Sequence, residues 1–335
     1  MVRVALDAMG GDGAPDTTVR AALRALDERG DSLEVLLVGD RDLLNRRLRA
    51  AGGAPKRLRV VPARETVGME EAPARAVRRK RESAIVVGLE LQRRGEADAF
   101  VSAGSTGAVM AAATLELGTL PGVDRPAVGA VVPTAETPVL LLDVGANVDS
   151  PPRQLHQFAH LGAVYAREVL GVARPRVGLL NVGEEPGKGD EASVRAHELL
   201  RSDGDLRFVG NVEGSRVIRG ACDVLVCDGF VGNVLLKFYE SLAGFVAGLV
   251  REAAGDGEAP GLRRIRTLLD YAEYGGAPLL GVDGVAVICH GASSARAVRN
   301  AVGVAVRAVT SDTTGKLSRD LGARWGPPEG GRRGP

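Results

Sequence analysis

Residues 2–12 read VRVALDAMGGD, and they set the pattern for the rest of the chain. A short strand-like run over residues 2–8 passes into a turn that contains Gly10 and Gly11. Residues 16–29 follow with apolar side chains at helical spacing. A strand, a glycine turn and a helix in this order form the unit of an α/β fold with a parallel sheet.

The same unit recurs along the chain. Further strand-like runs lie at residues 33–38, 58–61, 99–102, 127–132, 139–142, 176–181, 206–209, 224–227 and 285–289. Helical patterns lie at residues 40–50, 72–94, 106–117, 151–170, 190–202, 231–253, 260–274 and 293–311. We therefore predict a three-layer α/β/α fold with a mainly parallel sheet. Residues 1–323 are expected to form one catalytic unit of two lobes around a cleft, and residues 324–335 a mobile Gly/Pro tail.

Composition restricts the classes of function. The chain has 335 residues, with 43 Lys and Arg against 42 Asp and Glu, and its net charge of +1 argues against binding nucleic acid by bulk charge. Aromatic residues make up only 3%, so we expect no base-stacking platform and a core of Val, Leu, Ala and Ile. The 45 glycines are close to twice the usual share, which indicates many tight turns and backbone placed close to a ligand.

Cysteines and termini point to the cytoplasm. Cys222, Cys227 and Cys289 lie in or beside apolar runs without a CxxC pair, and we expect them to be reduced and buried. The chain enters a strand-like run at once, so we expect no secretory signal. The longest uncharged stretch, residues 99–115, carries Ser, Thr and Gly in its middle, which makes a membrane-spanning helix a poor interpretation.

Six of the predicted strands end in polar loops that contain glycine. These loops read DAMGGD (7–12), AGSTGA (103–108), DVGANVDS (143–150), VGEEPGKGDE (182–191), DGFVGN (228–233) and HGASSA (290–295). Ligands of open α/β sheets bind beyond the carboxyl ends of the strands, so we expect the six loops to share one edge. Glycine turns and helix starts offer N–H groups to anions, and phosphate is the predicted ligand.

The common nucleotide and nucleophile motifs are incomplete. Lys188 follows Gly187 but precedes Gly189 instead of Ser or Thr, so a Walker loop is excluded. Gly187, Gly189 and Ala192 match a dinucleotide fingerprint only loosely, and the chain has no GxSxG elbow.

A zinc motif is incomplete as well. His156 and His160 have the i, i+4 spacing of a zinc pair, but Gln157 stands where a metalloprotease has its glutamate. We expect a half-exposed histidine pair on a helix face, and neither a metal nor another cofactor.

The motifs DAMGGD, SAGSTGA, LLDVGANVD, LLNVGEEPGKGDE, DGFVGNVLLK and YGGAPLLGVDGVAVICHG occur in this order. Together they closely resemble the bacterial phosphate acyltransferase family, over residues 2–310. The resemblance implies a fold like those of isopropylmalate dehydrogenases and phosphotransacetylases. It also implies that the chain makes acyl phosphate from acyl-acyl-carrier-protein and inorganic phosphate, for phospholipid synthesis.

The resemblance further implies a cytoplasmic homodimer that associates with the membrane and contacts a downstream glycerol-3-phosphate acyltransferase, without metal or nucleotide cofactor. The family carries an apolar helical hairpin before YGGAP, and here residues 250–269 are short and polar at the tip. Membrane contact through this segment is therefore an open expectation, which rests on Arg263, Arg264 and Arg266 meeting anionic lipid.

Attack of phosphate on a thioester needs little machinery, because phosphate is a nucleophilic dianion and a thiolate is a tolerable leaving group. The protein must hold the phosphate near the carbonyl carbon and stabilise the oxyanion. Only five of the basic residues are lysines, and Lys188 lies between two glycines after a predicted strand, so it is the first candidate for the cation. Asp228 is expected to orient Lys188 or accept a proton, and Asn233 to donate to the oxyanion; helix capping and turn formation are the structural alternatives.

Other residues are expected to bind phosphate or substrate through N–H groups, hydroxyls or an imidazole, with capping and loop structure as alternatives. These residues are Gly10, Gly11, Ser102, Gly104, Ser105, Thr106, Gly107, Gly187, Gly189, Gly232 and His290. Asp7, Asp12, Asp143 and Asn147 are expected to shape loops. For Lys237, function and a solvated place on a helix face are equally supported.

The carrier protein is acidic by implication of the family. RRKR at residues 78–81 and RRIR at 263–266 are candidate docking charges, with a solvated helix face as the alternative. Two other functions remain open: a scaffold that binds carrier protein without catalysis, and an NAD-dependent hydroxyacid dehydrogenase of the shared fold.

Overall fold

The computed structural model describes residues 1–254 and 275–326. Its strands are β1 (Val2–Asp7), β2 (Leu33–Gly39), β3 (Leu58–Pro62), β4 (Ala99–Ser102), β5 (Ala127–Val132), β6 (Val139–Leu142), β7 (Arg176–Asn181), β8 (Arg207–Glu213), β9 (Val224–Val226), β10 (Ala277–Leu280) and β11 (Ala286–Ile288). Its helices are α1 (Asp16–Arg29), α2 (Arg41–Ala50), α3 (Pro73–Arg79), α4 (Ala84–Arg93), α5 (Thr106–Glu116), α6 (Pro152–Glu168), α7 (Glu191–Ser202), α8 (Gly214–Val217), α9 (Gly229–Ala254), α11 (Ala295–Thr310) and α12 (Thr313–Trp325).

All ten predicted strands are confirmed, and the sequence reading missed β10. This strand is short and carries Pro278 at its second position, a residue that argues against a central strand because it lacks an N–H group. It nevertheless pairs antiparallel with β11 on one side and with β5 on the other.

The predicted helix over residues 72–94 is two helices, α3 and α4. The break occurs because the N–H groups of Arg64 and Glu65 donate to the carbonyl of Glu82, and Glu65 forms a bridge with Ser83. Helix α12 was also missed, and it extends through Trp325, two residues into the expected tail. The helix expected at residues 260–274 and residues 327–335 of the tail lie outside the described residues.

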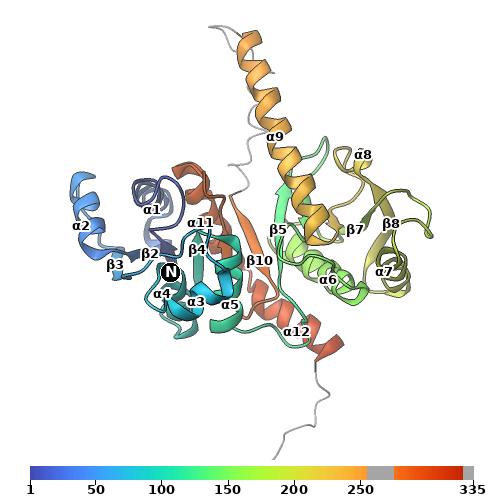
Figure 1. Cartoon of the computed structure of the whole chain (residues 1–335), viewed down its shortest axis with the longest axis horizontal. Coiled ribbons are helices and arrows are strands. Elements are labelled where there is room, and N and C mark those ends of the chain that lie inside the picture. Colours follow the sequence, from blue (N-terminus) through green and yellow to red (C-terminus); the bar gives the residue numbers. More distant parts are fainter. Residues whose placement is uncertain (255–274, 327–335) are drawn as a thin grey trace, which may run out of the picture.

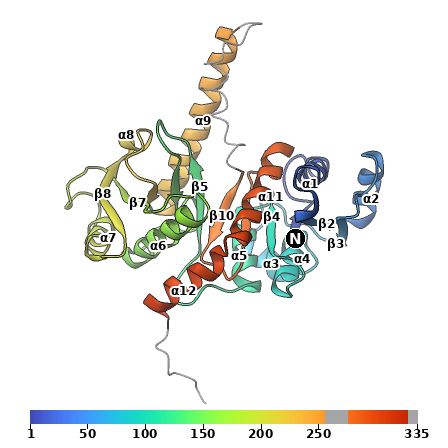
Figure 2. The same ribbon diagram turned by 180° about the vertical axis from the view of Figure 1, so that it is seen from behind.

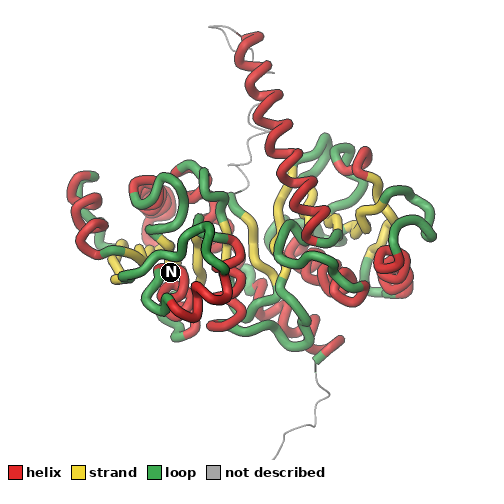
Figure 3. The backbone as a smooth tube through the Cα atoms, viewed as in Figure 1, coloured by secondary structure: helices red, strands yellow, loops and turns green. Residues whose placement is uncertain are grey.

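The strands of the described chain form one continuous sheet in the order β3-β2-β1-β4-β11-β10-β5-β6-β9-β7-β8. The pairs are parallel from β3 to β11, antiparallel on both sides of β10 and between β5 and β6, and parallel from β6 to β8. Figure 3 shows these strands passing between the helices. The mainly parallel α/β/α prediction is confirmed.

The three reversals correct one expectation about the loops. Strands β6, β9 and β7 run opposite to β1, β4 and β11, so the polar loops do not all leave the same edge of the sheet. They form one group after β1, β4 and β11 and a second group after β6, β9 and β7. The expectation of a single edge was wrong because it assumed strands of one direction.

Helices cover both faces of the sheet (Figures 1 and 2). Buried Val, Leu and Ala side chains from α1 and α11 pack on one face of the first half, and those of α6, α7 and α12 on the second half. Side chains of α3, α4 and α5 pack on the opposite face of the first half, within an apolar core that continues into the second half beneath α9. Figure 1 shows the far end of α9 projecting beyond the rest of the molecule.

Candidate active site

The loops after β1 and β4 are held together by buried hydrogen bonds. Asp7 accepts from the N–H groups of Met9 (2.9 Å) and Gly10 (3.1 Å). The hydroxyl of Ser102 donates to Asp7 Oδ2 (2.6 Å) and accepts from Gly104 N–H (2.9 Å). Burial raises the pKa of Asp7, against the effect of these hydrogen bonds. Asp7 therefore shapes its loop, and the fully buried Ser102 supports it instead of offering its hydroxyl to a ligand.

Close packing accounts for several glycines of this group. A Cβ at Gly10 would lie 2.6 Å from both Asp7 Oδ2 and the backbone nitrogen of Gly104, and one at Gly107 would lie 2.7 Å from Pro73. Gly11 has φ +96°, which disfavours a side chain there. These glycines let the loops approach one another, and their geometry does not require a ligand.

The loops after β6 and β9 meet at the start of α9. Asp143 accepts from the N–H groups of Val128 (2.9 Å) and Asn147 (2.6 Å) and so shapes its loop. Asp228 Oδ1 accepts from the N–H groups of Phe230 (2.8 Å) and Val231 (3.1 Å), which is the capping arrangement that the sequence left as an alternative.

The loop between β7 and α7 carries Lys188. Asn181 anchors the loop, because its Nδ2 donates to the carbonyl of Lys188 (2.9 Å). Gly189 has φ +96°, and a Cβ there would lie 2.6 Å from Asn181 Oδ1. Gly187 instead faces open space, and the Lys188 side chain is exposed. The loop thus presents an ammonium group to solvent beside a rigid turn.

A cavity of about 170 Å³, which we call the central cleft, lies between the two halves of the sheet. Its floor is apolar and includes Val128, Val144 and Ile288. Its polar lining comes from both halves: Thr106, Asn233, Lys237, Glu240, His290 and Ser293. Helix α9 connects the halves, since it starts after β9 and runs over the sheet until Tyr239 donates to the carbonyl of Pro133 (3.0 Å).

Two helices begin at the central cleft. Thr106 is the first residue of α5, and Ser293 directly precedes the N-cap residue of α11, Ser294. Free N–H groups at helix starts attract anions. His290 Nδ1 accepts from Ala292 N–H (3.1 Å), so its Nε2 carries the proton of the neutral ring and can donate to a ligand. Lys237 adds an ammonium group, paired with Glu240 at 2.8 Å.

A larger cavity of about 750 Å³, which we call the apolar cavity, lies on the other side of the start of α9. Its apolar walls come from α6, β7, the loop after β7, and α9: Leu155, Leu179, Leu180, Val182, Phe230, Val231, Val234, Leu235 and Phe238. Polar groups lie at its lining too, among them Asn181, Gly189, Ser193 and Asp228. Such a lining suits a long apolar chain with a polar group at one end.

The structure separates the residues singled out from the sequence. Thr106, Asn233 and His290 lie together in the central cleft, whereas Gly189 and Asp228 line the apolar cavity. Gly187 and Lys188 line neither cavity, but they directly precede Gly189 and so lie at the edge of the apolar cavity. The remaining predicted residues with little or no exposure are Gly10, Ser102, Gly104, Ser105 and Gly232. Sequence reasoning missed Ser293 and left Lys237 open, although the pair of serines after His290 marked a helix start.

Two expectations about other groups have clear outcomes. The three cysteines are free and buried, as predicted, and burial raises the pKa of Cys222 and Cys289 to about 12. The half-exposed histidine pair is wrong for His160, which is 2% exposed because Asp203 and Trp325 lie against it.

Among the described residues, Gly229–Leu249 is the one stretch long and apolar enough to cross a membrane, and most of it is exposed. Its first turns are packed against the sheet domain, since Asp228 caps the helix and Gly232 lies against Asp143. Length and composition alone are weak evidence for a membrane span.

Comparisons with known proteins extend over nearly the whole chain. The model of a family described as fatty acid synthesis protein matches residues 2–316. The phosphate acyltransferase of Heliobacterium modesticaldum is 49% identical over 318 residues, covering 92% of this chain and 94% of the relative. That of Desulforamulus reducens is 50% identical over 331 residues, covering 96% and 98%.

Solved structures with the same fold have low sequence identity. A phosphotransacetylase from Streptococcus pyogenes aligns with a TM-score of 0.66 at 17% identity, covering 92% of this chain and 94% of that one. A branched-chain phosphotransacylase from Enterococcus faecalis aligns with a TM-score of 0.60 at 18% identity, covering 92% and 99%. At this identity the likeness establishes the fold alone.

Proposed function

Since the chain belongs to the fatty acid synthesis protein family, whose curated relatives are phosphate acyltransferases, we propose that it transfers a fatty acyl group from acyl-acyl-carrier-protein to inorganic phosphate. The product is an acyl phosphate for phospholipid synthesis. The observation that carries this proposal is the central cleft, where an exposed amide, imidazole and ammonium group face two helix starts.

In the proposed reaction, an oxygen of orthophosphate attacks the carbonyl carbon of the thioester. A carbon–oxygen bond forms, the carbon–sulfur bond breaks, and the electron pair leaves with the carrier thiolate, which takes up a proton. The helix starts at Thr106 and Ser293, with Lys237, hold the phosphate dianion. The Asn233 amide donates to the developing oxyanion, and His290 donates to phosphate through Nε2.

Lys188 is proposed as the second cation, acting from the loop at the edge of the apolar cavity. Asp228 lies at the same cavity and caps α9 with Oδ1, so it fixes the helix turn that bears Asn233. The thioester is proposed to lie at this first turn of α9, with its acyl chain in the apolar cavity and the phosphate in the central cleft.

The carrier protein is proposed to dock beside α3. Of the four charges at residues 78–81, Lys80 is paired with Glu71 (2.5 Å) and Arg81 with the buried Glu116 (2.6 Å). Arg79 also lies 3.6 Å from Glu71, but it and Arg78 are exposed on α3, which packs against the start of α5 at the central cleft. These two guanidinium groups suit an acidic partner. The other candidate, residues 263–266, lies outside the described residues.

The exposed apolar face of α9 is proposed to serve the homodimer and peripheral contact with the membrane. Beyond the residues at the apolar cavity, it presents Leu242, Phe245 and Leu249, which are 37%, 63% and 49% exposed. An apolar stripe of this kind on a projecting helix is typical of an interaction surface. We propose that the enzyme acts in the cytoplasm, at the membrane surface, and passes its product to a glycerol-3-phosphate acyltransferase.

Thiol release from acyl-acyl-carrier-protein tests the function. We expect release that requires orthophosphate and does not change on adding NAD. Binding of the loaded carrier without release would instead identify a scaffold, and oxidation of a hydroxyacid with NAD would identify a dehydrogenase.

A further inference from the structure

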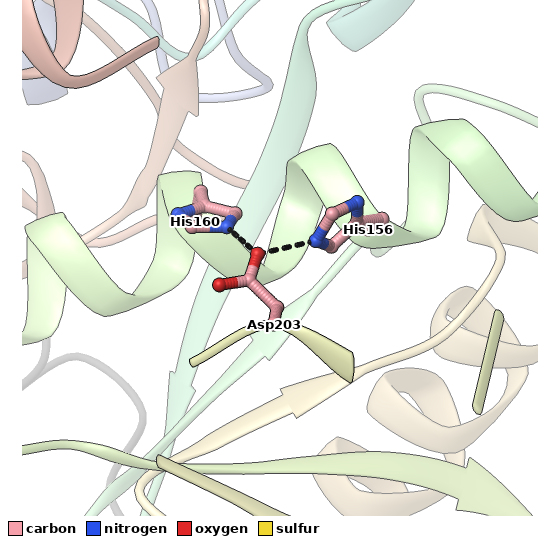
Figure 4. A group of neighbouring side chains, drawn as sticks. All are labelled: His156, His160 and Asp203. Carbon is pink, nitrogen blue, oxygen red and sulfur yellow. Dashed lines mark hydrogen bonds and ion pairs between the residues drawn. The ribbon is translucent and has the colours of Figure 1, made fainter. Parts of the chain in front are cut away.

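A cluster of polar side chains joins α6 to α12 and shares no residue with the lining of the central cleft or the apolar cavity. His156 and His160 lie one turn apart on α6, and their Nε2 atoms lie 2.6 and 2.7 Å from Oδ2 of Asp203, the C-cap residue of α7 (Figure 4). The side chains of His160 and Asp203 are 3% and 9% exposed. All three of these potential ligand atoms lie within 4.8 Å of one another.

His160 lies between two carboxylates. Its Nε2 faces Asp203, and its Nδ1 faces Oδ2 of Asp320 on α12 at 3.5 Å. A neutral imidazole has one N–H group, so one of its two nitrogens then presents a lone pair to a carboxylate oxygen. Two such lone pairs repel at this distance. Arg324 places a positive charge beside both carboxylates, with Nη1 3.9 Å from Asp203 Oδ1 and Nε 3.6 Å from Asp320 Oδ2, but a cation bound at the ligand atoms would also remove the repulsion at the imidazole.

The surroundings orient the three ligand atoms toward a common point. In the metal-free protein, Nε2 of His160 lies at hydrogen-bond distance from Asp203 (2.7 Å). With a cation bound at Nε2, the proton of His160 would reside on Nδ1, which faces Asp320; such a carboxylate partner is usual behind a metal-bound histidine. The other oxygen of Asp203, Oδ1, accepts from Asp205 N–H (3.0 Å), so Oδ2 is the oxygen left for the histidines. Burial opposes ionisation of Asp203, but the hydrogen bonds from both histidines outweigh it and lower its pKa to about 2.

The cluster is also enclosed. The Trp325 ring packs edge-on against both imidazoles, with centroid distances of 5.3 Å to His156 and 5.2 Å to His160. Arg324 lies 3.9 Å from Oδ1 of Asp203, the oxygen that faces away from the histidines. The low exposure of the ligand atoms strengthens any interaction with a cation held between them.

We propose that His156, His160 and Asp203 bind a divalent transition metal ion of the zinc class, with water as the fourth ligand. Two imidazole nitrogens and a carboxylate oxygen are a usual zinc donor set, and the i, i+4 spacing places both rings on one helix face. Because zinc ligands bind at about 2.0 Å in a tetrahedron, each Nε2 has to move away from Asp203 by roughly half an ångström. The ion would tie the end of α7 to α6, so its effect is on stability.

Metal titration of the whole protein tests this inference. The protein is dialysed against a chelator, and Zn²⁺ binding is then measured by calorimetry and Co²⁺ binding by visible absorption. We expect one ion per chain, a rise in the melting temperature with Zn²⁺, and the intense absorption bands of tetrahedral Co²⁺. His160→Gln and Asp203→Asn should weaken binding at least tenfold, because each removes a ligand. His290→Gln, which changes an exposed histidine of the central cleft, should bind as tightly as the wild type.

Several results would overturn the proposal. Wild-type protein that binds less than one ion per chain would do so, as would equal binding by His160→Gln. If the variants fail to fold, the wild-type Co²⁺ spectrum and the number of imidazoles seen by X-ray absorption at bound Zn²⁺ still decide. Weak octahedral bands, or an imidazole count other than two, would show that His156 and His160 do not both bind the ion and would overturn the proposal.

Discussion

Gly232 lies so close to Asp143 that a Cβ on this glycine would be 1.9 Å from the Asp143 carbonyl oxygen. The contact joins the first turn of α9 to the end of β6. The next residue is Asn233, so the same contact sets where its amide enters the central cleft. The packing of Gly232 therefore affects both the position of α9 in the fold and the position of the proposed oxyanion donor.

Gly232→Ala is expected to destabilise the protein by about 1–3 kcal/mol, the usual cost of overpacking, and to lower activity because Asn233 shifts. Denaturant unfolding measures the stability. Gly187→Ala is the matched control, since nothing lies within 4 Å of a Cβ there, and its stability should match or slightly exceed that of the wild type. A stable Gly232→Ala variant with wild-type activity would show that α9 shifts freely over β6.

The two proposed cations have different expected signatures. Lys237 holds phosphate in the central cleft, so Lys237→Ala should raise the KM for phosphate. Lys188→Ala should lower kcat and leave binding of the carrier protein largely intact. A lost charged hydrogen bond contributes about 1.5–3 kcal/mol, which corresponds to a loss of roughly 10–150-fold.

Steady-state kinetics at varied phosphate separates the two variants. Lys56→Ala, at an exposed position that lines neither cavity, should leave both constants unchanged. Near-normal turnover of Lys188→Ala would remove that residue from the mechanism.

The cluster at His156 predicts how stability depends on pH in chelator-treated protein. Burial lowers the pKa of His156 below 6.5, against the effect of Asp203. As the pH falls below 6.5, the unfolded chain takes up a proton that the folded protein resists, so stability falls. The loss is about 1.4 kcal/mol per pH unit until the pH passes the pKa of the folded protein.

Asp203 adds an effect of the same sign at lower pH. Its pKa is lowered to about 2, so the stability it contributes is present above pH 3.8 and is lost as the pH falls from there toward 2.

The free energy of unfolding, measured from pH 7 to 5 in the wild type and in His156→Gln, isolates the contribution of the histidine. A wild-type curve that parallels the curve of the variant would argue against the lowered pKa.

The apolar cavity predicts an effect of acyl chain length. Val234→Trp fills part of the cavity, so long-chain substrates should lose more activity than short-chain ones. Each methylene excluded from an apolar site costs about 0.8 kcal/mol, or roughly fourfold. Val209→Trp, at an exposed position on β8, is the control. Equal loss at every chain length would place the acyl group elsewhere.

Local patterns in the sequence were sufficient for most elements of the fold. Each of the ten apolar runs that the sequence marked as strand-like proved to be a strand, because a buried parallel strand favours continuous apolar residues. Pro278 hid β10, whereas the change of strand direction that divides the polar loops lies between β5 and β6, two strands that the sequence did predict. Direction is a property of pairing between distant segments, and no local pattern encodes it.

The candidate site was predictable in its residue types and less so in its geometry. The polar loops marked Thr106, Asn233 and His290, which do meet in the central cleft. The same loops also marked Ser102 and Gly104, which are buried and support the turn. Glycine and serine serve both roles, so only packing distinguishes them. Asp203 lies far in sequence from the histidines that it binds, which is why spacing on α6 alone could not reveal the cluster.

The fate of isotopically labelled orthophosphate tests the central claim most directly. With acyl-acyl-carrier-protein as donor, we predict one labelled acyl phosphate for each thiol released. Asn233→Ala should slow this transfer by about 10²–10³-fold, the usual effect of losing an oxyanion donor. Thiol release that leaves all of the label in free orthophosphate would contradict direct attack by phosphate.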